Sequence, residues 1–224
     1  MGRPHRVDVG GYVYHVLNRG NARRTIFDDD SDYAAFEKVM TEAVERLSMR
    51  LLAYCTLSNH WHMILWPRRD GDLSSFMSWL TLTHTQRWHA HRHDAGEGHV
   101  YQGRYKSFLV DRDAYYLAAC RYVERNALRA NLTGRAEHWR WCSLWRRRHA
   151  QLTDNVPPLT EWPVAHPRNW LQRVNQPETQ QELDALRRCV SRGSPFGRDS
   201  WVKRIVGKCG LESTTRPRGR PRET

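Results

Sequence analysis

Two runs of strand-forming residues flank the dipeptide Ser58-Asn59, and this pattern constrains the fold more than any other part of the sequence. The first run covers residues 51–57, and the second covers residues 60–66 and stops at Pro67. Serine and asparagine favour tight turns, while proline cannot continue a central strand. The sequence therefore predicts a β-hairpin whose second strand begins at His60.

Strand and helix patterns also alternate before and after this hairpin. They are a strand at 11–17 and a helix at 31–47 before it, then a helix from residue 72, a strand at 105–110 and a helix at 113–130. The order β-α-β-β-α-β-α predicts an α+β fold, a ferredoxin-like antiparallel four-stranded sheet with helices on one face. The histidine-rich stretch 89–93 is predicted to be a loop.

The regular pattern ends after residue 132, which divides the chain into three parts. Residues 1–132 form the predicted sheet domain, residues 133–213 a mostly helical C-terminal extension, and residues 214–224 a flexible basic tail. Within the extension, an irregular proline-containing connector precedes helices near 178–189 and 200–207. The tail lacks the apolar residues that packing requires.

The overall charge narrows the class of partner. The 224 residues include 36 Lys and Arg against 24 Asp and Glu, a formal net charge of +12. Such a charge favours a polyanion, and nucleic acid is the commonest one. Apolar runs fall short of the roughly 18–20 residues of a membrane span, and no secretory signal opens the chain. We therefore expect a cytoplasmic, nucleoid-associated protein without a membrane partner. Its five scattered cysteines form neither a disulfide framework nor a zinc knuckle.

The predicted strand after the turn begins with His60-Trp61-His62. Side chains alternate along a strand, so both imidazoles project from one face and Trp61 from the other. Two neighbouring imidazoles can clamp a divalent cation. The alternative is a pair of surface or hydrogen-bonded histidines without a metal.

The helix at 113–130 carries a second group of candidate residues. Tyr122 and Asn126 share one helical face because they are four residues apart, and Arg125 and Arg129 lie beside them. Asn126 could give a metal an oxygen ligand, Tyr122 could attack a phosphodiester, and either arginine could hold a phosphate. A phenol with a pKa of about 10 needs a Lewis acid for this attack, and Mg²⁺ or Mn²⁺ is suitable. The alternative role for Tyr122 is that of a half-buried packing residue.

Several segments together resemble the REP-associated tyrosine transposases, which belong to the His-hydrophobic-His single-strand endonucleases with one catalytic tyrosine. They lie within roughly residues 12–132 and are Tyr14-His15-Val16-Leu17-Asn18-Arg19-Gly20, Ile26-Phe27, Ser58-Asn59-His60-Trp61-His62, Gln102-Gly103-Arg104-Tyr105-Lys106-Ser107-Phe108 and Arg121-Tyr122-Val123-Glu124-Arg125-Asn126. After the asparagine the family typically reads Pro-Val-Arg-Ala-Gly, whereas this chain reads Ala127-Leu128-Arg129-Ala130-Asn131. This departure concerns the end of the helix, not the nucleophile or the ligand.

The resemblance implies a nuclease domain in which His60, His62 and Asn126 bind Mg²⁺ or Mn²⁺ and Tyr122 is the catalytic nucleophile. In such enzymes the tyrosine attacks single-stranded DNA, keeps the 5′ phosphate covalently and releases a 3′ hydroxyl. Their substrates are imperfect palindromes, folded as hairpins beside a short guide tetranucleotide. We therefore predict a transposase-like DNA strand transferase that cleaves and rejoins REP-type hairpin DNA, as a monomer or a homodimer.

Basic residues within and near these segments, together with those of the tail, are the predicted DNA contacts. They are Arg19, Arg23, Arg24, Arg104, Lys106, Arg125, Arg129, Arg218 and Arg220. The tail sequence at 217–221 resembles an AT-hook core, whose arginines would enter a narrow A·T-rich minor groove. A nonspecific basic tail is the alternative.

Two other functions remain open from the sequence. One is a non-catalytic nucleic-acid-binding module, because a ferredoxin-like sheet also describes RNA-binding domains. The other is a zinc hydrolase built on His60 and His62, which would need a third ligand and would leave Tyr122 idle. Zinc could also bind the histidines of 84–93. A covalent protein–DNA adduct distinguishes the transposase from the binding module and from the zinc hydrolase, because only the transposase forms one.

Overall fold

A computed structural model describes residues 6–93, 98–151 and 156–216 of the chain. The strands are β1 (Val13–Arg19), β2 (Arg50–Leu57), β3 (His60–Trp66) and β4 (Lys106–Val110). The helices are η1 (Asn21–Arg23), α1 (Asp30–Leu47), α2 (Asp72–Arg92), α3 (Ala114–Glu124), α4 (Asn126–Arg129), η2 (Ala136–His138), α5 (Ser143–Arg148), α6 (Trp170–Asn175), α7 (Gln180–Arg192), α8 (Asp199–Cys209) and α9 (Glu212–Thr215). None of these helices is long and apolar enough to span a bilayer.

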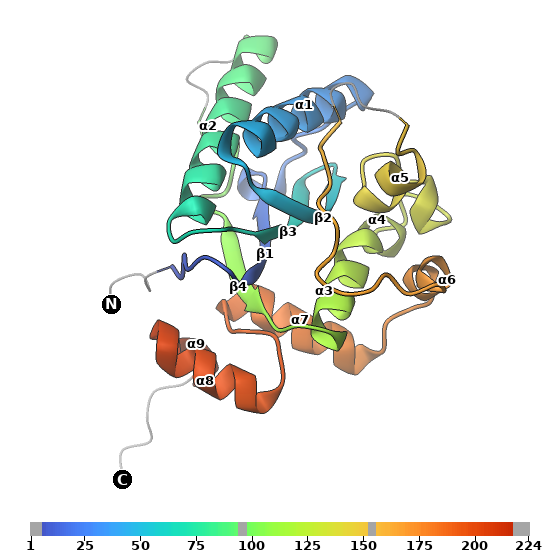
Figure 1. The fold of residues 1–224 in the computed structure, drawn as a ribbon. Helices are drawn as coiled ribbons and strands as arrows, with labels where there is room; N and C mark the ends of the chain where they lie inside the picture. The colour runs from blue at the N-terminus through green and yellow to red at the C-terminus, as the bar shows by residue number, and fades with distance from the viewer. Residues whose placement is uncertain (1–5, 94–97, 152–155, 217–224) are drawn as a thin grey trace.

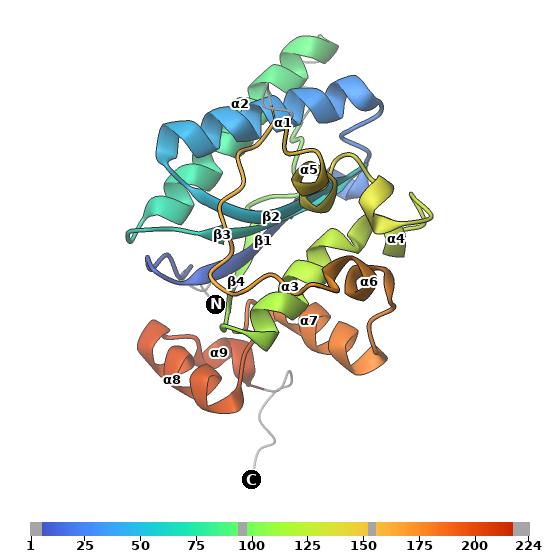
Figure 2. The ribbon, with the colours of Figure 1, turned by 45° about the vertical axis from the view of Figure 1, so that its right-hand side comes forward.

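The four strands form one antiparallel sheet in the order β2-β3-β1-β4. The crossover helices α1 and α2 lie side by side on one face of this sheet (Figure 1). The other face is covered by α3 and, beyond it, by helices of the C-terminal extension (Figure 2). The α+β, ferredoxin-like prediction is therefore confirmed, and its strand β3 is central, paired with β1 on one side and β2 on the other.

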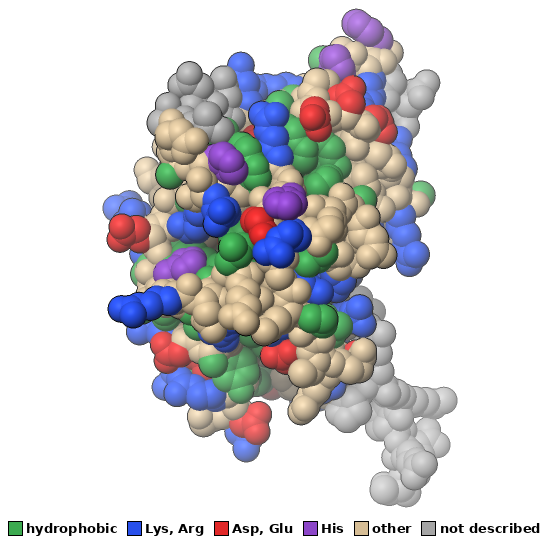
Figure 3. All heavy atoms as spheres, turned by 90° about the vertical axis from the view of Figure 1, so that its right-hand side faces the viewer, with side chains coloured by type: hydrophobic (Ala, Val, Ile, Leu, Met, Phe, Trp, Pro, Cys, Tyr) green, Lys and Arg blue, Asp and Glu red, His purple; other side chains and the backbone are tan. Residues whose placement is uncertain are grey.

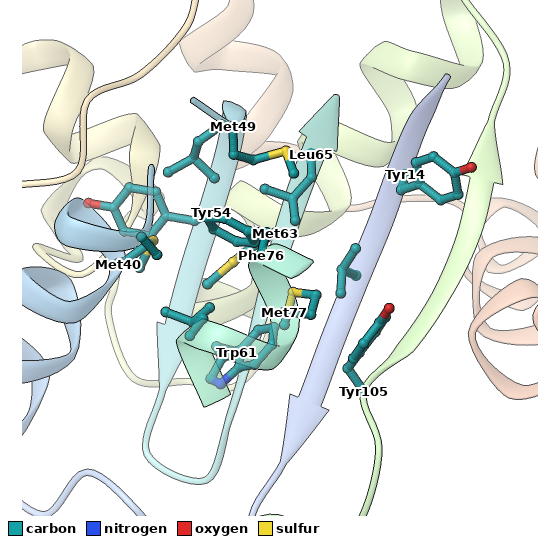
Figure 4. Packing of buried hydrophobic residues seen from close by; sticks show 14 of the residues in the cluster. Tyr14, Met40, Met49, Tyr54, Trp61, Met63, Leu65, Phe76, Met77 and Tyr105 are labelled. Atoms are coloured by element: carbon teal, nitrogen blue, oxygen red, sulfur yellow. The ribbon is translucent and has the colours of Figure 1, made fainter. Parts of the chain in front are cut away.

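The core on the α1/α2 face is rich in large side chains. Trp61, Met63 and Leu65 point from β3 into this layer, where Figure 4 shows them against Phe76 and Met77 of α2. Alternate residues of β3 thus enter one layer, which is the pattern of a strand. The Trp61 ring nitrogen donates a hydrogen bond to the Tyr101 hydroxyl at 3.2 Å, so its polar atom is satisfied inside the core.

The core on the α3 face joins the sheet to the C-terminal extension. Its members include Ile64 of β3 and Phe108 of β4, with Trp170 and Leu186 from the extension. At its centre lies the fully buried Glu124, whose carboxylate accepts hydrogen bonds from Ser143 Oγ and Trp170 Nε1, each at 2.7 Å. The hydrophobic core therefore crosses the predicted boundary between residues 132 and 133.

The end of α2 differs from the sequence prediction. The loop predicted at 89–93 is wrong for residues 89–92, because α2 continues to Arg92. Arg92 forms ion pairs with Asp28 at 2.6 Å and with Asp32 at 2.7 Å, and its guanidinium lies 4.2 Å from the Trp88 ring. These tertiary contacts hold the last helical turn, and His93 then ends it in the left-handed conformation, with φ of 52°.

The helix predicted at 113–130 is divided at Arg125 into α3 and α4. The break is mild, because the Arg125 amide still bonds to the Arg121 carbonyl at 2.9 Å. Beyond α4, Asn131 adopts a φ of 56°, in the left-handed region where asparagine is tolerated better than most residues. Asn131 thus performs the conformational task for which glycine is the usual residue at a helix end.

Chain segments from the extension cover the outer edge of β2. Thr160 donates its backbone N–H to the Leu51 carbonyl at 2.8 Å, and Trp162 Nε1 donates to the Leu52 carbonyl at 2.9 Å. Further along, the Thr56 amide donates to the Trp141 carbonyl at 2.9 Å. The connector near 157–167 lacks regular structure, as predicted, and it satisfies an exposed strand edge.

Three arginines at four-residue intervals fasten α3 and α4 to the extension. Arg121 donates hydrogen bonds to the carbonyls of Gln176 and Pro177, at 2.9 and 2.8 Å. Arg125 donates to the carbonyls of Val174 and Asn175, at 3.0 and 2.7 Å. These guanidinium groups therefore satisfy the backbone acceptors at the end of α6 and beyond.

A single carboxylate, that of Glu178, joins two of these arginines. Its side chain is 4% exposed and forms ion pairs with Arg125 Nε at 3.0 Å and Arg129 Nη1 at 2.9 Å. Two half-buried guanidinium charges thus share one acidic partner with a buried side chain. Such a group is costly to remove because its partners stay in place without compensation.

Replacing Glu178 with Gln should lower the free energy of unfolding by about 3 kcal/mol, as expected for a broken buried ion pair. This loss corresponds to a fall of roughly 6–12 °C in Tm for a chain of this size. Thermal unfolding followed by circular dichroism measures the change. The matched control is Asp184→Asn in α7, where the carboxylate is 54% exposed. Equal Tm values for the two variants would contradict a structural role for Glu178.

Candidate active site

The turn between β2 and β3 is held by hydrogen bonds from the segment that follows β1. The Ser58 carbonyl accepts the amides of Ile26 and Phe27, at 2.8 and 3.0 Å, and the Asn59 carbonyl accepts the Gly20 amide at 2.8 Å. From this turn, β3 sends His60 and His62 to the α3 face, with their ring centroids 5.2 Å apart. The two imidazoles are neighbours, as strand alternation predicts.

The orientation of the His60 ring follows from its hydrogen bond to Asn59. His60 Nδ1 lies 2.6 Å from Asn59 Oδ1, while Asn59 Nδ2 donates to the Arg23 carbonyl at 3.1 Å. The second bond establishes which end of the amide faces the ring. Because an amide oxygen only accepts, His60 Nδ1 must carry the proton, and the lone pair of the neutral ring is on Nε2.

His62 is paired with a third histidine that sequence reasoning missed. His62 Nδ1 lies 2.9 Å from Nε2 of His15, a fully buried residue of β1. Part of the information was in the sequence, because the ferredoxin-like strand order places β1 beside β3. To pair His15 with His62, one must also know the register of the two strands, in which His62 lies opposite Leu17 and His15 opposite Ile64. The register follows from the packing of the whole sheet.

Burial keeps these three imidazoles neutral. It lowers the pKa of His15 to about 3 and that of His60 to about 4, and it holds the pKa of His62 well below its ordinary value. The charge of Arg129 lowers all three pKa values further. A neutral imidazole keeps the lone pair that a metal ligand requires.

Tyr122 reaches the same histidines from the last turn of α3. Its ring centroid lies 5.8 Å from that of His62 and 6.0 Å from that of His15, in edge-to-face contacts. The other tyrosines of this helix lie elsewhere: Tyr116 is buried edge-on to Trp162, and Tyr115 contacts Phe196. Among the tyrosines of α3, Tyr122 is thus the one at the His pair.

Arg129 connects Tyr122 with Asn126. Its guanidinium lies 4.1 Å from the centre of the Tyr122 ring and donates to Asn126 Oδ1 at 2.9 Å. The Asn126 Nδ2 atom is buried and lacks a hydrogen-bond partner among the described residues. The other side of Arg129 is held by Glu178. Tyr122, Asn126 and the extension therefore meet at one guanidinium.

The donor atoms present fit a divalent cation with mixed nitrogen and oxygen ligands. The described residues contain no group of three or more His, Cys, Asp or Glu side chains that could hold a metal. Asn126 offers an oxygen donor of another type, because its Oδ1 has a second lone pair beside its bond to Arg129. With two imidazoles, this set suits Mn²⁺, or a Mg²⁺ ion that keeps several waters.

Three of the predicted DNA contacts line one groove. Arg19, Arg104 and Lys106 surround a groove of about 500 Å³ together with Arg6, and its lining includes no acidic residue. Arg19 lies opposite His60 in the β1–β3 register, so one residue that lines this groove is a neighbour of the His pair in the sheet. A groove with four cations and no acidic side chain is a surface that a phosphate backbone would bind.

The other predicted contacts have different surroundings. Arg23 is exposed, and the Arg24 guanidinium lies 5.0 Å from the Trp88 ring. Arg125 and Arg129 are occupied by Glu178, while Arg218 and Arg220 lie outside the described residues.

On the face over α4–α6, the basic side chains of the described residues do not gather into one patch. Figure 3 shows the face over α4–α6, where basic side chains are dispersed among acidic ones and histidines. Of the tryptophans there, Trp141 stacks on Tyr33 and Trp139 donates to the Thr56 carbonyl, so both pack against the sheet domain.

Comparisons with known proteins concern the fold and the family of this chain. Among solved structures, a REP-associated tyrosine transposase bound to a REP hairpin matches with a TM-score of 0.56 and 16% identity, over 75% of this chain and 98% of that one. A presumed transposase from Deinococcus radiodurans R1 matches with a TM-score of 0.39 and 14% identity, over 58% and 92% of the two chains, and carries no argument at that score. A comparison of the sequence with curated proteins finds no match. The REP-associated tyrosine transposase therefore shows that the fold is shared.

The sequence itself is matched by a family description. Residues 8–126, which are more than half of the chain, match the family described as transposase IS200 like. This range runs from the residues before β1 to Asn126 and contains His15, the His60–His62 pair and Tyr122. The chain therefore belongs to the IS200-like transposase family.

Proposed function

We propose that this transposase is a metal-dependent DNA strand transferase that cleaves and rejoins single strands at hairpin-forming, REP-type sequences. The observation that carries this proposal is the contact of the Tyr122 ring with the His62 ring. His60 and His62 both use Nδ1 for a hydrogen bond within the protein, so each would offer Nε2 to a metal. The hairpin substrate is supported by the similar transposase that was solved with a REP hairpin. Its place of action would be cytoplasmic DNA.

The proposed reaction exchanges one ester for another. The Tyr122 oxygen attacks phosphorus and gives its proton to solvent, the bond from phosphorus to the 3′ oxygen breaks, and that oxygen leaves as a hydroxyl after gaining a proton. The 5′ phosphate stays on the tyrosine as an ester, which a second 3′ hydroxyl can attack to rejoin the DNA. His60, His62 and Asn126 would hold Mg²⁺ or Mn²⁺, which supplies Lewis acidity to the phosphate oxygens when bound.

Other side chains would guide the strand. The unpartnered Asn126 Nδ2 is a buried donor that a phosphate oxygen could satisfy. Arg19, Arg104 and Lys106 would bind the backbone along the groove that they line. Arg125 and Arg129 would act less directly, because Glu178 already neutralises part of their charge.

Replacing Tyr122 with Phe should abolish both cleavage and the covalent adduct while DNA affinity stays unchanged. The substitution removes the phenolic oxygen and keeps the ring that packs against His62 and Arg129. Denaturing gel electrophoresis with end-labelled hairpin DNA detects the adduct, and peptide mapping locates it. The control is Tyr115→Phe, the same substitution at another tyrosine of α3, and it should behave as wild type. An adduct that persists without the Tyr122 hydroxyl would refute the assignment.

Replacing His60 with Ala should reduce cleavage by at least about a hundredfold, because a metal ligand and its Lewis acidity are lost. DNA binding should stay close to wild type, since phosphate contacts supply most of the affinity. Cleavage assays in Mn²⁺ and fluorescence anisotropy separate the two effects. The exposed His138 of η2, replaced with Ala, is the control. Cleavage at the wild-type rate by the His60 variant would contradict the role of His60 as a metal ligand.

Replacing both Arg104 and Lys106 with Ala should weaken DNA binding and flatten its dependence on salt. Each lost contact to a single-stranded phosphate lowers the slope of log K against log salt by about 0.7, so about 1.4 in total. Anisotropy titrations at several salt concentrations give this slope. The matched control removes two exposed cations of α1, Lys38 and Arg46, which do not line the groove. Equal slopes for both double variants would show that the groove does not bind the strand.

A further inference from the structure

Both histidines of the proposed metal site are held through their Nδ1 atoms. We propose that Asn59 and His15 are positioning residues, which fix the ring tautomers of His60 and His62 so that both Nε2 lone pairs are presented to a divalent cation. This inference rests on the proposed function and deepens it. Its carrying observation is the pair of contacts, 2.6 Å from His60 Nδ1 to Asn59 Oδ1 and 2.9 Å from His62 Nδ1 to His15 Nε2.

The number of protons determines what His15 must do. A neutral imidazole has one N–H and one lone pair, so of His15 and His62 one ring donates and the other accepts. If His15 donated, His62 would carry its proton on Nε2 and could not bind a metal. When His15 accepts at Nε2, His62 is protonated on Nδ1 and its Nε2 is open. Metal-bound histidines usually need such an outer acceptor, which fixes both tautomer and ring orientation.

The surroundings of His15 show that packing alone does not explain it. The residue is fully buried, its Nδ1 has no hydrogen-bond partner in the described part of the chain, and its ring lies 4.7 Å from that of Phe108. An apolar side chain would fill this space without leaving a polar atom unsatisfied. Leaving His15 Nδ1 without a partner costs free energy of folding. That cost is offset if His15 Nε2 accepts the hydrogen bond that orients His62.

His15 also contacts the nucleophile. Its ring centroid lies 6.0 Å from that of Tyr122, which in turn lies 5.8 Å from His62. The three rings form one closed contact set, so the residue that orients a ligand also sets the position of the attacking side chain. A change at His15 should therefore affect metal binding first and cleavage as a consequence.

The first test compares His15→Phe with His15→Gln in the full-length protein. Isothermal titration with Mn²⁺ measures metal affinity, and anisotropy measures DNA affinity. The Phe variant should raise the Kd for Mn²⁺ by about 10–100-fold, the usual effect of losing an outer-shell partner. The Gln variant offers a carbonyl acceptor and should recover much of that loss. DNA affinity without metal should change less than about twofold in both, because phosphate contacts supply it.

The matched control is His84→Phe. His84 is equally buried, but it belongs to α2 on the other face of the sheet, where its Nδ1 lies 2.7 Å from the Tyr101 hydroxyl. The same imidazole-to-phenyl change there should leave Mn²⁺ affinity at the wild-type value. A loss of Mn²⁺ affinity equal to that of His15→Phe would show a general effect of core disruption and would overturn the inference.

The Asn59 half of the inference has its own pair of variants. Asn59→Asp keeps an oxygen acceptor for His60 Nδ1 and should retain Mn²⁺ binding, whereas Asn59→Ala removes it and should weaken Mn²⁺ binding by about tenfold or more. Equal Mn²⁺ affinity in both variants would overturn this half.

A second measurement reads the tautomers directly and needs no substitution at His15. Long-range proton–nitrogen spectra of protein with ¹⁵N-labelled histidine, saturated with Mg²⁺, should show His60 and His62 protonated on Nδ1. A proton on Nε2 of His62 would overturn the inference even if the His15 variants failed to fold. If the wild type binds no Mn²⁺ and forms no adduct, the proposed function fails as well. If it does both while His15→Phe binds Mn²⁺ equally well, only the positioning role falls.

Discussion

The central position of β3 is the constraint on which the candidate site depends. A strand that pairs on both sides and is covered on both faces has no freedom to slip, since a shift of one residue would exchange its two sets of side chains. Trp61 fills the layer under α1 and α2, and this fixes His60 and His62 on the layer of α3. The placement of the two candidate histidines is thus secured by the burial of the tryptophan between them.

The extension contributes to the site through charge as well as packing. Glu178 holds Arg129, and Arg129 in turn contacts the Tyr122 ring and the Asn126 oxygen. A carboxylate beyond residue 132 therefore influences two candidate residues of the sheet domain. The buried Glu124 strengthens the same junction from the opposite direction, because Ser143 and Trp170 of the extension both donate to it. Helix α3, which carries Tyr122, and the extension form one structural unit.

Local patterns predicted most of the sheet domain. The hairpin at Ser58-Asn59 and the alternation of His60 and His62 depend on neighbouring residues, so they can be found in the sequence. The last turn of α2 could not be found that way, because Arg92 is held by aspartates about 60 residues away. His15 and Glu178 were missed for the same reason. Each acts on a partner that is distant in sequence, and only packing brings the two together.

The covering of the β2 edge and of the end of β4 has a consequence for assembly. The connector and residues near Trp141 bond to β2, and Phe196 exchanges backbone hydrogen bonds with Leu109 and Asp111 at the end of β4, each at 2.8 Å. Strand edges treated in this way do not recruit further strands. At β2 and at the end of β4, the pairing of a strand from a second copy is therefore disfavoured. Because β3 is paired on both sides, it would keep the same neighbours in one copy or in two.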